Sequence, residues 1–486
     1  MNRRFVLVEI LIIILVGLLG ATLKVHKVGA SETIYIRASG SVEPPWTPIS
    51  TVDNVTYTFT DNINASIVVE RDNIILNGAS YTLQGTGADE SKGIYLEGIK
   101  NVTIRNIAIR AFDYGILFSA SSNNSITGNN IAENKFLGIQ LSSSSNNSVY
   151  ENNITENDSY GIELDQSSTY NNIYENNITN SQFCVALYGS SYNNIVKNNI
   201  TNSGFGILLA NSSNHTSIVE NNITRGHGIE LDWSSYNSIV GNTFVNDGLY
   251  VWDSYGNMVE RNVVNNKPLV YLEGMSNNTI DEAGQVILVN CDNIRVENLN
   301  LSNTSAGLEL WRTNNTMIGN NSMTSNIFGI SLAGSSNNSI FGNNIMNNYI
   351  GIYLFESANN NVIGNVIKEN ERGIWLYYLS SNNEIYHNNF IDNYQQVYSN
   401  NLTNIWDDGY PSGGNYWSDY SDVDQYSGPY QNNTGSDEIW DHQYVIDENN
   451  KDNYPIVPEF PSVLILPLFM ITTLPAVIVY KRKHFQ

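Results

Sequence analysis

The sequence predicts an all-β protein, a single-domain parallel β-helix with about 22 residues and three short strands in each coil. Three observations predict this solenoid. A unit Gly-Ile-x-Leu-x-x-Ser-Ser-x-Asn-Asn-x-Ile-x-x-Asn-Asn-Ile recurs at that spacing, apolar residues alternate within it, and proline is nearly absent between residues 49 and 410. A repeat of this length is typical of solenoid proteins, whose units stack on one another.

The repeat can be followed by its leading position, which is glycine in every coil but one. Successive leading positions are 20 to 23 residues apart, and the phase is lost between Lys267 and Asn290. A single unit buries too few aliphatic side chains to offset the entropy of ordering it, so the units must stack. The leading residues are Gly93, Gly115, Gly138, Gly161, Cys184, Gly206, Gly228, Gly248, Gly307, Gly329, Gly351 and Gly373.

Within each unit the apolar pattern predicts strands separated by tight corners. Ile162 and Leu164 alternate as in a strand with one buried face, and Ile173 and Ile178 follow singly among Asn, Ser and Gly. Each coil must donate backbone N–H groups to its neighbour, which proline cannot do. Pro268 is the one proline inside the array, and it lies where the phase is lost.

Paired asparagines mark two corners of the predicted coil. Asparagine accepts the left-handed backbone of a sharp corner, and stacked amides bond along an array. We therefore interpret the pairs as structural rather than ligand-binding. Several also form Asn-x-Ser/Thr sequons, and on an exported protein some would carry glycan. The pairs include Asn123-Asn124, Asn146-Asn147 and Asn337-Asn338 at one corner, and Asn152-Asn153, Asn176-Asn177 and Asn198-Asn199 at the other.

Both ends of the chain predict export and anchoring. Arg3-Arg4, the apolar run 5–23 and Val28-Gly29-Ala30 are the parts of a secretory signal. The apolar stretch 462–480 before Lys481-Arg482-Lys483 predicts a membrane segment with a cytoplasmic C-terminus, and the bulk of the chain at the cell surface. The expected divisions are a signal peptide (1–30), an N-terminal cap with the first coils (31–92), the repeats (93–400), a C-terminal cap (401–457) and an anchor (458–486).

The charge balance excludes nucleic acid as a partner. The chain has 47 acidic and 23 basic residues, a formal net charge of −24, and such a surface repels phosphate polymers. Two cysteines in 486 residues cannot make a disulfide framework, so Cys184 and Cys291 are predicted to fill small core or corner positions.

Three segments resemble known families. The stretch from Tyr57 to Gly85, with Ile67-Val68-Val69-Glu70-Arg71-Asp72-Asn73 inside it, is similar to the opening of archaeal NosD-like right-handed β-helix proteins, as are the Asn-Asn-Ser-Ile coils. The segment from Trp406 to Tyr420 resembles the one that closes that helix. Pro458-Glu459-Phe460-Pro461 is similar to the PEF-CTERM sorting signal.

The resemblance implies two different activities. The wider group of carbohydrate-binding proteins and sugar hydrolases implies interaction with glycans, whereas the name NosD implies a periplasmic role in copper loading of a reductase. The histidines of this sequence stand at no ligand spacing, methionine is sparse, and Cys184 and Cys291 are several coils apart. Copper needs clustered soft ligands, so we expect no tight copper site.

Two carboxylate pairs stand at outward positions of the first strand. Glu163 and Asp165, like Glu230 and Asp232, would lie about 6–7 Å apart on one face, a glycosidase-like separation. The pairs are separated by three coils, about 14 Å, so they do not form one site. They are the candidate catalytic residues for a polysaccharide-active enzyme.

Further outward positions of the same strands predict an acidic and aromatic strip that suits sugar stacking, helped by Ca²⁺ on paired carboxylates. The alternative is a solvated sheet face whose acids keep the protein soluble. The predicted ligand-binding residues are Tyr188, Trp252, Glu309, Trp311, Tyr353 and Trp375.

The closing segment is a second candidate site. Its carboxylates form an oxygen-rich loop that would hold Ca²⁺, the one cofactor considered. The alternative, which we favour, is that Trp406, Tyr416, Trp417 and Tyr420 plug the open apolar end of the solenoid. The candidate calcium ligands are Asp407, Asp408, Asp419, Asp422 and Asp424.

Three functional hypotheses follow. The first is a non-enzymatic, surface-anchored β-helix that acts as a spacer or binds surface polysaccharide. The second is a hydrolase, lyase or epimerase that uses the outward carboxylates. The third is a copper accessory protein of the NosD type.

Overall fold

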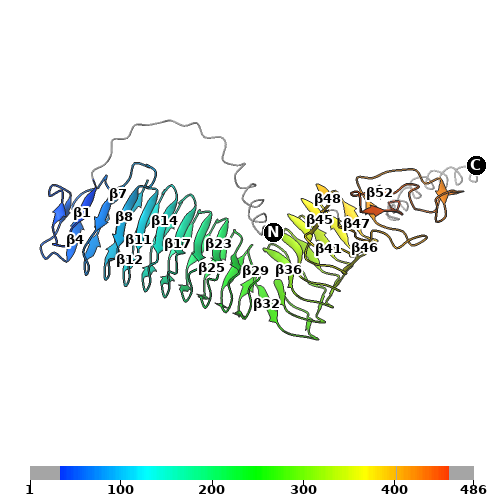
Figure 1. Cartoon of the computed structure of the whole chain (residues 1–486), viewed down its shortest axis with the longest axis horizontal. Helices are drawn as coiled ribbons and strands as arrows, with labels where there is room; N and C mark the ends of the chain where they lie inside the picture. Colours follow the sequence, from blue (N-terminus) through cyan, green and yellow to red (C-terminus); the bar gives the residue numbers. More distant parts are fainter. Residues whose placement is uncertain (1–32, 401, 459–486) are drawn as a thin grey trace, which may run out of the picture.

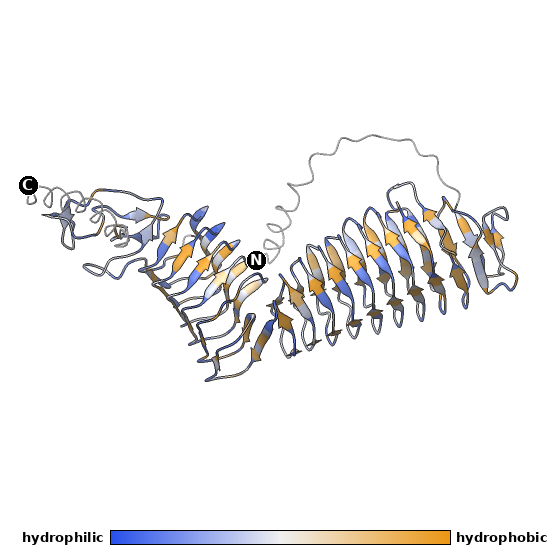
Figure 2. Cartoon of the chain, turned by 180° about the vertical axis from the view of Figure 1, so that it is seen from behind, coloured by the Kyte–Doolittle hydropathy of each residue, from blue (hydrophilic) through white to orange (hydrophobic). Residues whose placement is uncertain are grey.

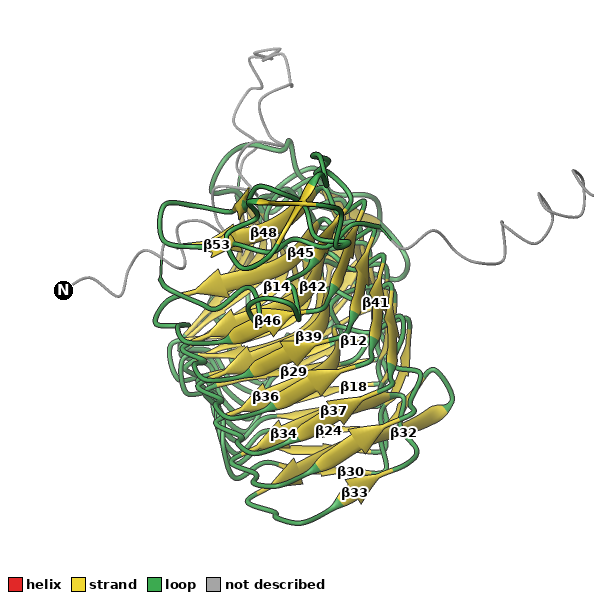
Figure 3. Ribbon diagram, turned by 90° about the vertical axis from the view of Figure 1, so that its right-hand side faces the viewer, coloured by secondary structure: helices red, strands yellow, loops and turns green. Residues whose placement is uncertain are grey.

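The computed structural model describes residues 33–400 and 402–458, and in this part of the chain it contains 53 β-strands and no helix. Strands of successive coils pair in parallel and stack into long sheets that wind around a common axis (Figures 1 and 3). The predicted parallel β-helix is confirmed. The predicted signal peptide (1–30) and nearly all of the predicted anchor (459–486) lie outside the described residues. The described part has no helix that is long and apolar enough to cross a membrane.

Each regular coil has three strands, as predicted, but the first is longer than the other two, with six residues in β17 against three in β18 and β19. In β17 the side chains of Ile162 and Leu164 are fully buried, whereas Glu163 and Asp165 point outward. Figure 2 shows the hydrophobic colour concentrated on the strands and the hydrophilic colour on the corners. The long strands are β8 (Lys92–Glu97), β11 (Tyr114–Ser119), β14 (Leu137–Ser142), β17 (Tyr160–Asp165), β20 (Phe183–Tyr188), β23 (Phe205–Ala210), β26 (Ile229–Asp232), β29 (Leu249–Trp252), β34 (Gln285–Val289), β36 (Ala306–Trp311), β39 (Phe328–Ala333), β42 (Ile350–Phe355), β45 (Arg372–Tyr377) and β48 (Gln395–Ser399).

The short strands form the other two sides of the rod. Second strands are β4 (Thr56–Phe59), β6 (Ile75–Asn77), β9 (Thr103–Arg105), β12 (Ser125–Thr127), β15 (Ser148–Tyr150), β18 (Asn172–Tyr174), β21 (Asn194–Val196), β24 (Ser217–Val219), β27 (Ser238–Val240), β30 (Met258–Glu260), β33 (Thr279–Ile280), β35 (Arg295–Glu297), β37 (Met317–Gly319), β40 (Ser339–Phe341), β43 (Asn361–Ile363) and β46 (Glu384–Tyr386). Third strands are β7 (Thr82–Gln84), β10 (Ala108–Arg110), β13 (Asn130–Ala132), β16 (Asn153–Thr155), β19 (Asn177–Thr179), β22 (Asn199–Thr201), β25 (Asn222–Thr224), β28 (Thr243–Val245), β31 (Val263–Val264), β38 (Ser322–Thr324), β41 (Asn344–Met346), β44 (Val366–Lys368), β47 (Asn389–Ile391) and β49 (Tyr416–Trp417). The N-terminal end adds β1 (Ile34–Ile36), β2 (Val42–Glu43), β3 (Ile49–Ser50) and β5 (Ile67–Val69), and the C-terminal end adds β50 (Tyr426–Ser427), β51 (Asn433–Thr434), β52 (Tyr444–Val445) and β53 (Lys451–Asp452).

Register between coils places each side chain over its equivalent. Ile139 of β14 pairs with Ile162 of β17, and Leu141 pairs with Leu164. Glycine leads the coil because the next backbone comes close: a Cβ at Gly138 would lie 2.6 Å from the carbonyl oxygen of Gly161. The thiols of Cys184 and Cys291 are free and buried, as predicted.

Buried asparagines form columns that run along the rod. The side-chain oxygen of Asn176 accepts from the backbone N–H and the amide of Asn152, both at 3.0 Å, and its own amide donates to Val149 O (2.8 Å), Tyr174 O (3.1 Å) and Asn198 Oδ1 (3.0 Å). The predicted amide stacking is therefore confirmed, with every polar atom of the buried amide in use.

The left-handed backbone falls differently at the two corners. At the first corner it is the first asparagine of the pair that is left-handed, for example Asn123 and Asn146, each with φ 57°. At the second corner the left-handed residue precedes the pair, as in Glu151 and Glu175. For the pairs predicted at the second corner, such as Asn152-Asn153 and Asn176-Asn177, the prediction that asparagine itself supplies this conformation was wrong, because one asparagine lies in the buried column and the other on the strand.

The rod bends where the repeat loses its phase. After β31 the chain turns through Asn265 and Asn266 into β32 (Lys267–Glu273), which runs antiparallel to β31 and then pairs in parallel with β34. The sheet made of third strands before the turn, which ends at β31, thus continues through β32 into the sheet made of long strands after the turn. Together they form one 16-stranded sheet. We call residues 33–264 the N-terminal arm and residues 267–458 the C-terminal arm; they meet at an angle (Figure 1).

At the bend, the outer face of the C-terminal arm covers the open end of the N-terminal arm. Ile287, Val289 and Trp311 pack into the core of the N-terminal arm, below its last coil. The free backbone edge of β29 is satisfied by side chains: Gln285 bonds both the N–H (2.9 Å) and the carbonyl (2.6 Å) of Leu249. The end of the N-terminal arm is therefore capped by the C-terminal arm.

Aromatic residues plug the far end of the C-terminal arm. Trp417 stacks on Phe390 at 4.3 Å between ring centroids and on Tyr444 at 4.2 Å, and Trp406 is buried beside it. The buried carboxylate of Asp452 accepts from Trp417 Nε1 at 2.9 Å, and burial raises the pKa of Asp452 to about 7. The prediction of an aromatic plug is confirmed for both tryptophans.

Candidate functional site

The outer face of the first sheet carries the predicted carboxylate pair on β17. The Gln140 amide, on the preceding coil, donates to Glu163 Oε2 at 2.9 Å and to Asp165 Oδ2 at 3.4 Å. Because one nitrogen contacts both oxygens, those oxygens lie within about 6 Å of each other. The second oxygen of Asp165 is buried and has no hydrogen-bond partner in the described part of the chain.

Burial changes the acidity of this pair. It raises the pKa of Glu163 to about 7, and the neighbouring Asp165 carboxylate adds to the rise. Burial also raises the pKa of Asp165 from its ordinary value, while hydrogen bonds from Ser142 and Gln140 oppose the rise. Near pH 7 the Glu163 carboxyl is therefore protonated in some molecules and ionised in others.

Two tyrosines stand beside the pair. The hydroxyl groups of Tyr160, on the same strand, and Tyr188, on the next coil, lie 3.3 Å apart, and both side chains are only partly buried. Next to them the outward positions are small or apolar, namely Ala186, Leu208 and Ala210, which form a cluster of their own. We call Gln140, Tyr160, Glu163, Asp165 and Tyr188 the β17 cluster.

The second carboxylate pair lies on β26, separated from β17 by β20 and β23 as predicted. Burial raises the pKa of Glu230 to about 7, with a further contribution from Asp232. Burial also raises the pKa of Asp232 to about 6. The two pairs do not share a contact, so the structure keeps them as two sites.

Four of the six residues of the predicted strip lie in the bend. Glu309 is 2% exposed and its two carboxylate oxygens accept from the Val251 N–H of β29 at 3.1 and 3.2 Å. Burial raises the pKa of Glu309 well above its ordinary value. The prediction of an exposed binding position was wrong for this residue, because the outer face of β36 covers the end of the N-terminal arm.

The aromatic residues around Glu309 are packed against one another. Trp252 contacts Trp311 and Phe355 edge to face, with ring centroids 4.8 and 5.0 Å apart. Trp311 and Tyr353 are 6% and 9% exposed. The bend thus buries Trp311 and Tyr353, a correction that follows from the same covering of the arm, whereas Trp252 stays partly exposed.

Trp375 remains on the outer face of the C-terminal arm. The Arg372 guanidinium lies 4.3 Å from the centre of its ring, and its indole N–H has no hydrogen-bond partner within the described residues. Tyr398 packs against it edge to face at 5.6 Å. Of the predicted strip, Tyr188 and Trp252 on the N-terminal arm and Trp375 on the C-terminal arm therefore stay partly exposed.

The closing segment does not gather its carboxylates around one point. Asp422 binds the His442 ring at 2.7 Å, Asp424 accepts from the N–H groups of residues 437 and 438, and Asp419 accepts from the Tyr444 hydroxyl. Asp408 accepts from Ser412 at 2.8 Å. No three of the His, Cys, Asp or Glu side chains in the described segments form a group that would hold a metal ion, and calcium binding by this segment stays a prediction. Each carboxylate instead holds a turn of the cap.

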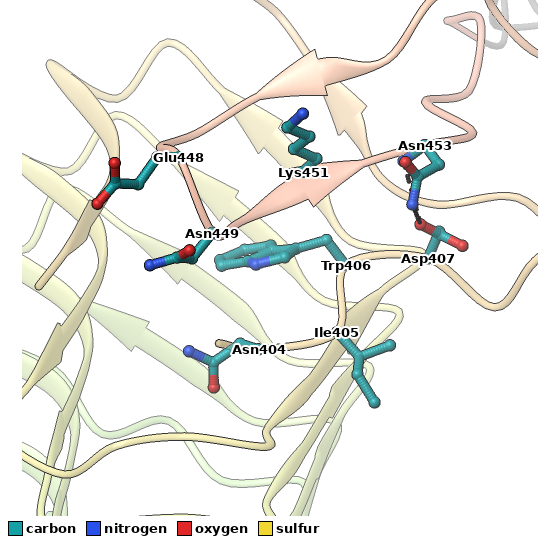
Figure 4. Close-up of a pocket in the computed structure, with 8 residues that line it drawn as sticks. All are labelled: Asn404, Ile405, Trp406, Asp407, Glu448, Asn449, Lys451 and Asn453. Carbon is teal, nitrogen blue, oxygen red and sulfur yellow. Dashed lines mark hydrogen bonds between the residues drawn. The ribbon is translucent and has the colours of Figure 1, made fainter. Parts of the chain in front are cut away.

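A pocket in this cap includes the remaining candidate. Figure 4 shows Asp407 beside Asn453. The Asn453 side-chain amide donates to the Asp407 carboxylate at 2.9 Å. The Asn453 backbone N–H donates to the same oxygen at 3.0 Å. The pocket is lined by Asn404, Ile405, Trp406, Asp407, Glu448, Asn449, Lys451 and Asn453.

One group of side chains was missed by the sequence reasoning. Tyr170, Tyr192, His215 and Tyr236 occupy the first corner in four consecutive coils and stack on one another. The signal was present in the sequence, because these residues replace the first asparagine of the repeated pair.

The fold and the arrangement of the coils define a protein of the right-handed parallel β-helix class, and residues 169–283 match the family described as "Right handed beta helix region". Residues 47–225 and 235–422 match the family described as "Periplasmic copper-binding protein (NosD)". The chain belongs to the NosD family. The predicted resemblance to NosD-like right-handed β-helix proteins is thereby confirmed, whereas the archaeal origin and the PEF-CTERM-like signal stay predictions. A periplasmic family is consistent with export.

Several solved structures match the chain at low similarity. DFA-IIIase from Arthrobacter chlorophenolicus A6 is 13% identical, with 57% of this chain and 63% of that one covered and a TM-score of 0.31. Pectate lyase Pel9A is 14% identical, with 48% and 68% covered and a TM-score of 0.28. The mannuronan C-5 epimerase AlgE6 A-module from Azotobacter vinelandii is 12% identical, with 70% and 89% covered and a TM-score of 0.24. Similarities this weak assign no activity to this chain, and no curated protein matches it.

The donor atoms that copper prefers are not assembled in residues 33–400 and 402–458. The ring of His215 is stacked between Tyr192 and Tyr236, and both cysteine thiols are buried. His387 bonds Ser412, and His442 bonds Asp422. These residues do not fit a copper site.

Proposed function

We propose that this protein is a non-enzymatic β-helix of the cell surface that binds polysaccharide through the β17 cluster and holds it away from the membrane anchor predicted at 458–486. The observation that carries the proposal is the Gln140 amide joining Glu163 and Asp165 beside the Tyr160–Tyr188 hydroxyl pair. Amide, carboxyl and phenol groups on one partly exposed face are the groups that bond sugar hydroxyls, and aromatic rings pack against sugar C–H surfaces. The proposal includes no cofactor.

Charge decides which polysaccharide suits this face. The chain carries a formal net charge of −24, and two carboxylate pairs stand on the first sheet, so polyanions are repelled and amino sugars are attracted. We therefore expect chitosan oligosaccharides to bind, and polygalacturonate to show no binding, in isothermal titration of the purified protein. Equal binding of both polymers would contradict the proposal.

Removing the ring of Tyr188 tests the site itself. Tyr188→Ala is expected to weaken chitosan oligosaccharide binding about two- to twelvefold, since an aromatic contact contributes about 0.5–1.5 kcal/mol and 1.4 kcal/mol is tenfold in Kd. The matched control is Tyr174→Ala, which removes a partly buried ring from the outer face of the second sheet. Loss of affinity in both variants alike would show that the ring loss acts through stability rather than through a site.

A second candidate function rests on the unequal acidity of the same pair. Two carboxylates within about 6 Å, one of them with a pKa raised to about 7, match the general acid and nucleophile of a retaining glycosidase. Glu163 would protonate the glycosidic oxygen and Asp165 would attack the anomeric carbon.

Hydrolysis by this pair would have a defined pH dependence. A general acid works only while protonated, so the rate is expected to fall as pH rises through about 7, where Glu163 loses its proton. Reducing ends released from a polysaccharide panel measure the rate, and Glu163→Gln is expected to abolish it. The matched variant is Glu230→Gln, which alters the second carboxylate pair. Release of reducing ends that survives in Glu163→Gln would show that Glu163 is not the general acid.

A further inference from the structure

The first corner of the coil is normally built from asparagine in a left-handed backbone. Asn101, Asn123 and Asn146, with φ of 57° each, hold it in the coils before residue 170, and Asn315, Asn337 and Asn359 hold it in the C-terminal arm. Asparagine tolerates this conformation better than bulky residues do. The corner position therefore has a clear local preference in this chain.

Four consecutive coils depart from that preference. Tyr170, Tyr192, His215 and Tyr236 adopt φ of 58°, 62°, 53° and 60°, which is an uncommon conformation for tyrosine. We call these four residues the corner ladder. A repeated departure from a favoured residue, at a conformational cost, is the kind of local strain that marks functional positions.

The rings of the corner ladder form one continuous stack along the rod. Successive ring centroids are 5.4, 4.9 and 5.4 Å apart, with interplanar angles of 17°, 11° and 12°. Tyr170, Tyr192 and Tyr236 are nevertheless 55%, 45% and 61% exposed. Because the faces cover one another, the ladder presents ring edges to solvent, together with three phenol hydroxyls and an imidazole.

Beside the ladder, the outward side chains of the second strands are uncharged, and they line a shallow hollow that Glu175 and Lys197 close at the next corner. Asn172 and Asn194 follow on the second strands, with the Asn194 amide donating to Asn172 Oδ1 at 2.8 Å. Beyond them Tyr174 stacks on Tyr150 at 4.8 Å, with their ring planes 2° from parallel, and Val196 continues that row. The neighbouring acidic and basic side chains, such as Lys197 and Glu220, stand at the next corner, where they pair at 3.7 Å.

We propose that the corner ladder binds a neutral polysaccharide that lies along the rod. The chain's net charge of −24 opposes a polyanion and also a second copy of itself, whereas this face offers an uncharged polymer hydroxyl, amide and apolar groups. The same groups recur once per coil, so a polymer of repeating sugars meets the same contacts at each step. This surface is distinct from the β17 cluster, and the two bind polymers of different charge.

The repeat itself supplies the test variant. In Tyr170→Asn/Tyr192→Asn/His215→Asn/Tyr236→Asn each residue becomes the one that holds this corner in other coils, so the variant is expected to fold with an unchanged or higher melting temperature. Binding of hydroxyethyl cellulose and laminarin, measured by affinity electrophoresis of the full chain, is expected to weaken at least tenfold. The single variant Tyr236→Asn, at one end of the stack, is expected to weaken binding at least twofold. It tests the proposal if the variant with all four substitutions does not fold.

Three results would overturn the proposal. The first is the failure of the parent protein to bind either polymer, and the second is equal binding by the parent and the Asn variants. The third is a concentration-dependent dimer of the parent, seen by sedimentation, that the Asn variants lose, because it would make the ladder an interface between copies. Tyr188→Ala is expected to leave neutral polymer binding unchanged, which separates this proposal from that for the β17 cluster.

Discussion

Replacing Asn176 by alanine is expected to lower the free energy of unfolding by about 3–5 kcal/mol, because a buried polar group left without its partner costs about 1–3 kcal/mol. The substitution removes the acceptor of the Asn152 N–H and the donor to the carbonyls of Val149 and Tyr174. All of these contacts are in the interior or at its edge, where water does not replace them.

Equilibrium denaturation in urea measures this loss, and the chain offers a matched control one residue away. Asn177 points outward and its amide bonds the exposed Asn153 side chain at 2.8 Å. Asn177→Ala is expected to change the stability by less than about 1 kcal/mol, because water replaces an exposed hydrogen bond. Equal losses in the two variants would mean that the buried columns do not stabilise the coils.

The second large effect concerns removal of a whole coil. Deleting 356–377 takes out 22 residues, the spacing between equivalent asparagines in this arm, and joins Phe355 to Tyr378. Asn338 would then pair with Asn383, and each buried side chain at the junction would again stack on the equivalent residue of the next coil. Because each coil contacts mainly its neighbours, a shorter rod that still folds is expected.

Deleting 356–366 is the matched control, since it removes half as many residues from the same place. The strand faces then fall out of register, so apolar side chains meet corners and the buried amides lose their partners. The C-terminal arm is expected to unfold, with loss of its share of the β signal in circular dichroism and cleavage of this arm by protease. A half-coil deletion as stable as the whole-coil deletion would contradict the stacking of equivalent residues.

Local features of the sequence were sufficient to predict the coils. Alternation such as Ile162-x-Leu164 identifies the buried face, and the constant spacing of the leading glycines identifies the period. Both are properties of residues that are neighbours in the chain or equivalent in successive units, so no long-range information is needed to find them.

The bend lay beyond this kind of reasoning. Loss of phase near Pro268 shows that the repeat stops, yet which sheet continues across the interruption depends on pairing between β32 and β34. That choice decides that Glu309 lies under β29 instead of in solvent. An outward position was therefore predicted correctly by its pattern and still became buried.

The corner ladder shows the opposite case, where the information was local and was passed over. Counting the repeated asparagine pairs draws attention to what recurs, whereas Tyr192 and His215 are informative because they interrupt it. The β17 cluster was found because carboxylates on alternate positions of one strand necessarily share a face.

The way Gln285 and Glu309 bond the last strand of the N-terminal arm has a consequence for how molecules meet. An unpaired parallel edge is a template on which another chain adds its own strand, and a rod with bare ends would grow by joining others end to end. Here a pair of side chains from the same molecule occupies the N–H groups that such a newcomer needs. The bend thus closes this end of the N-terminal arm, and it leaves no free N–H groups at Leu249 and Val251 on which a second molecule would add a strand.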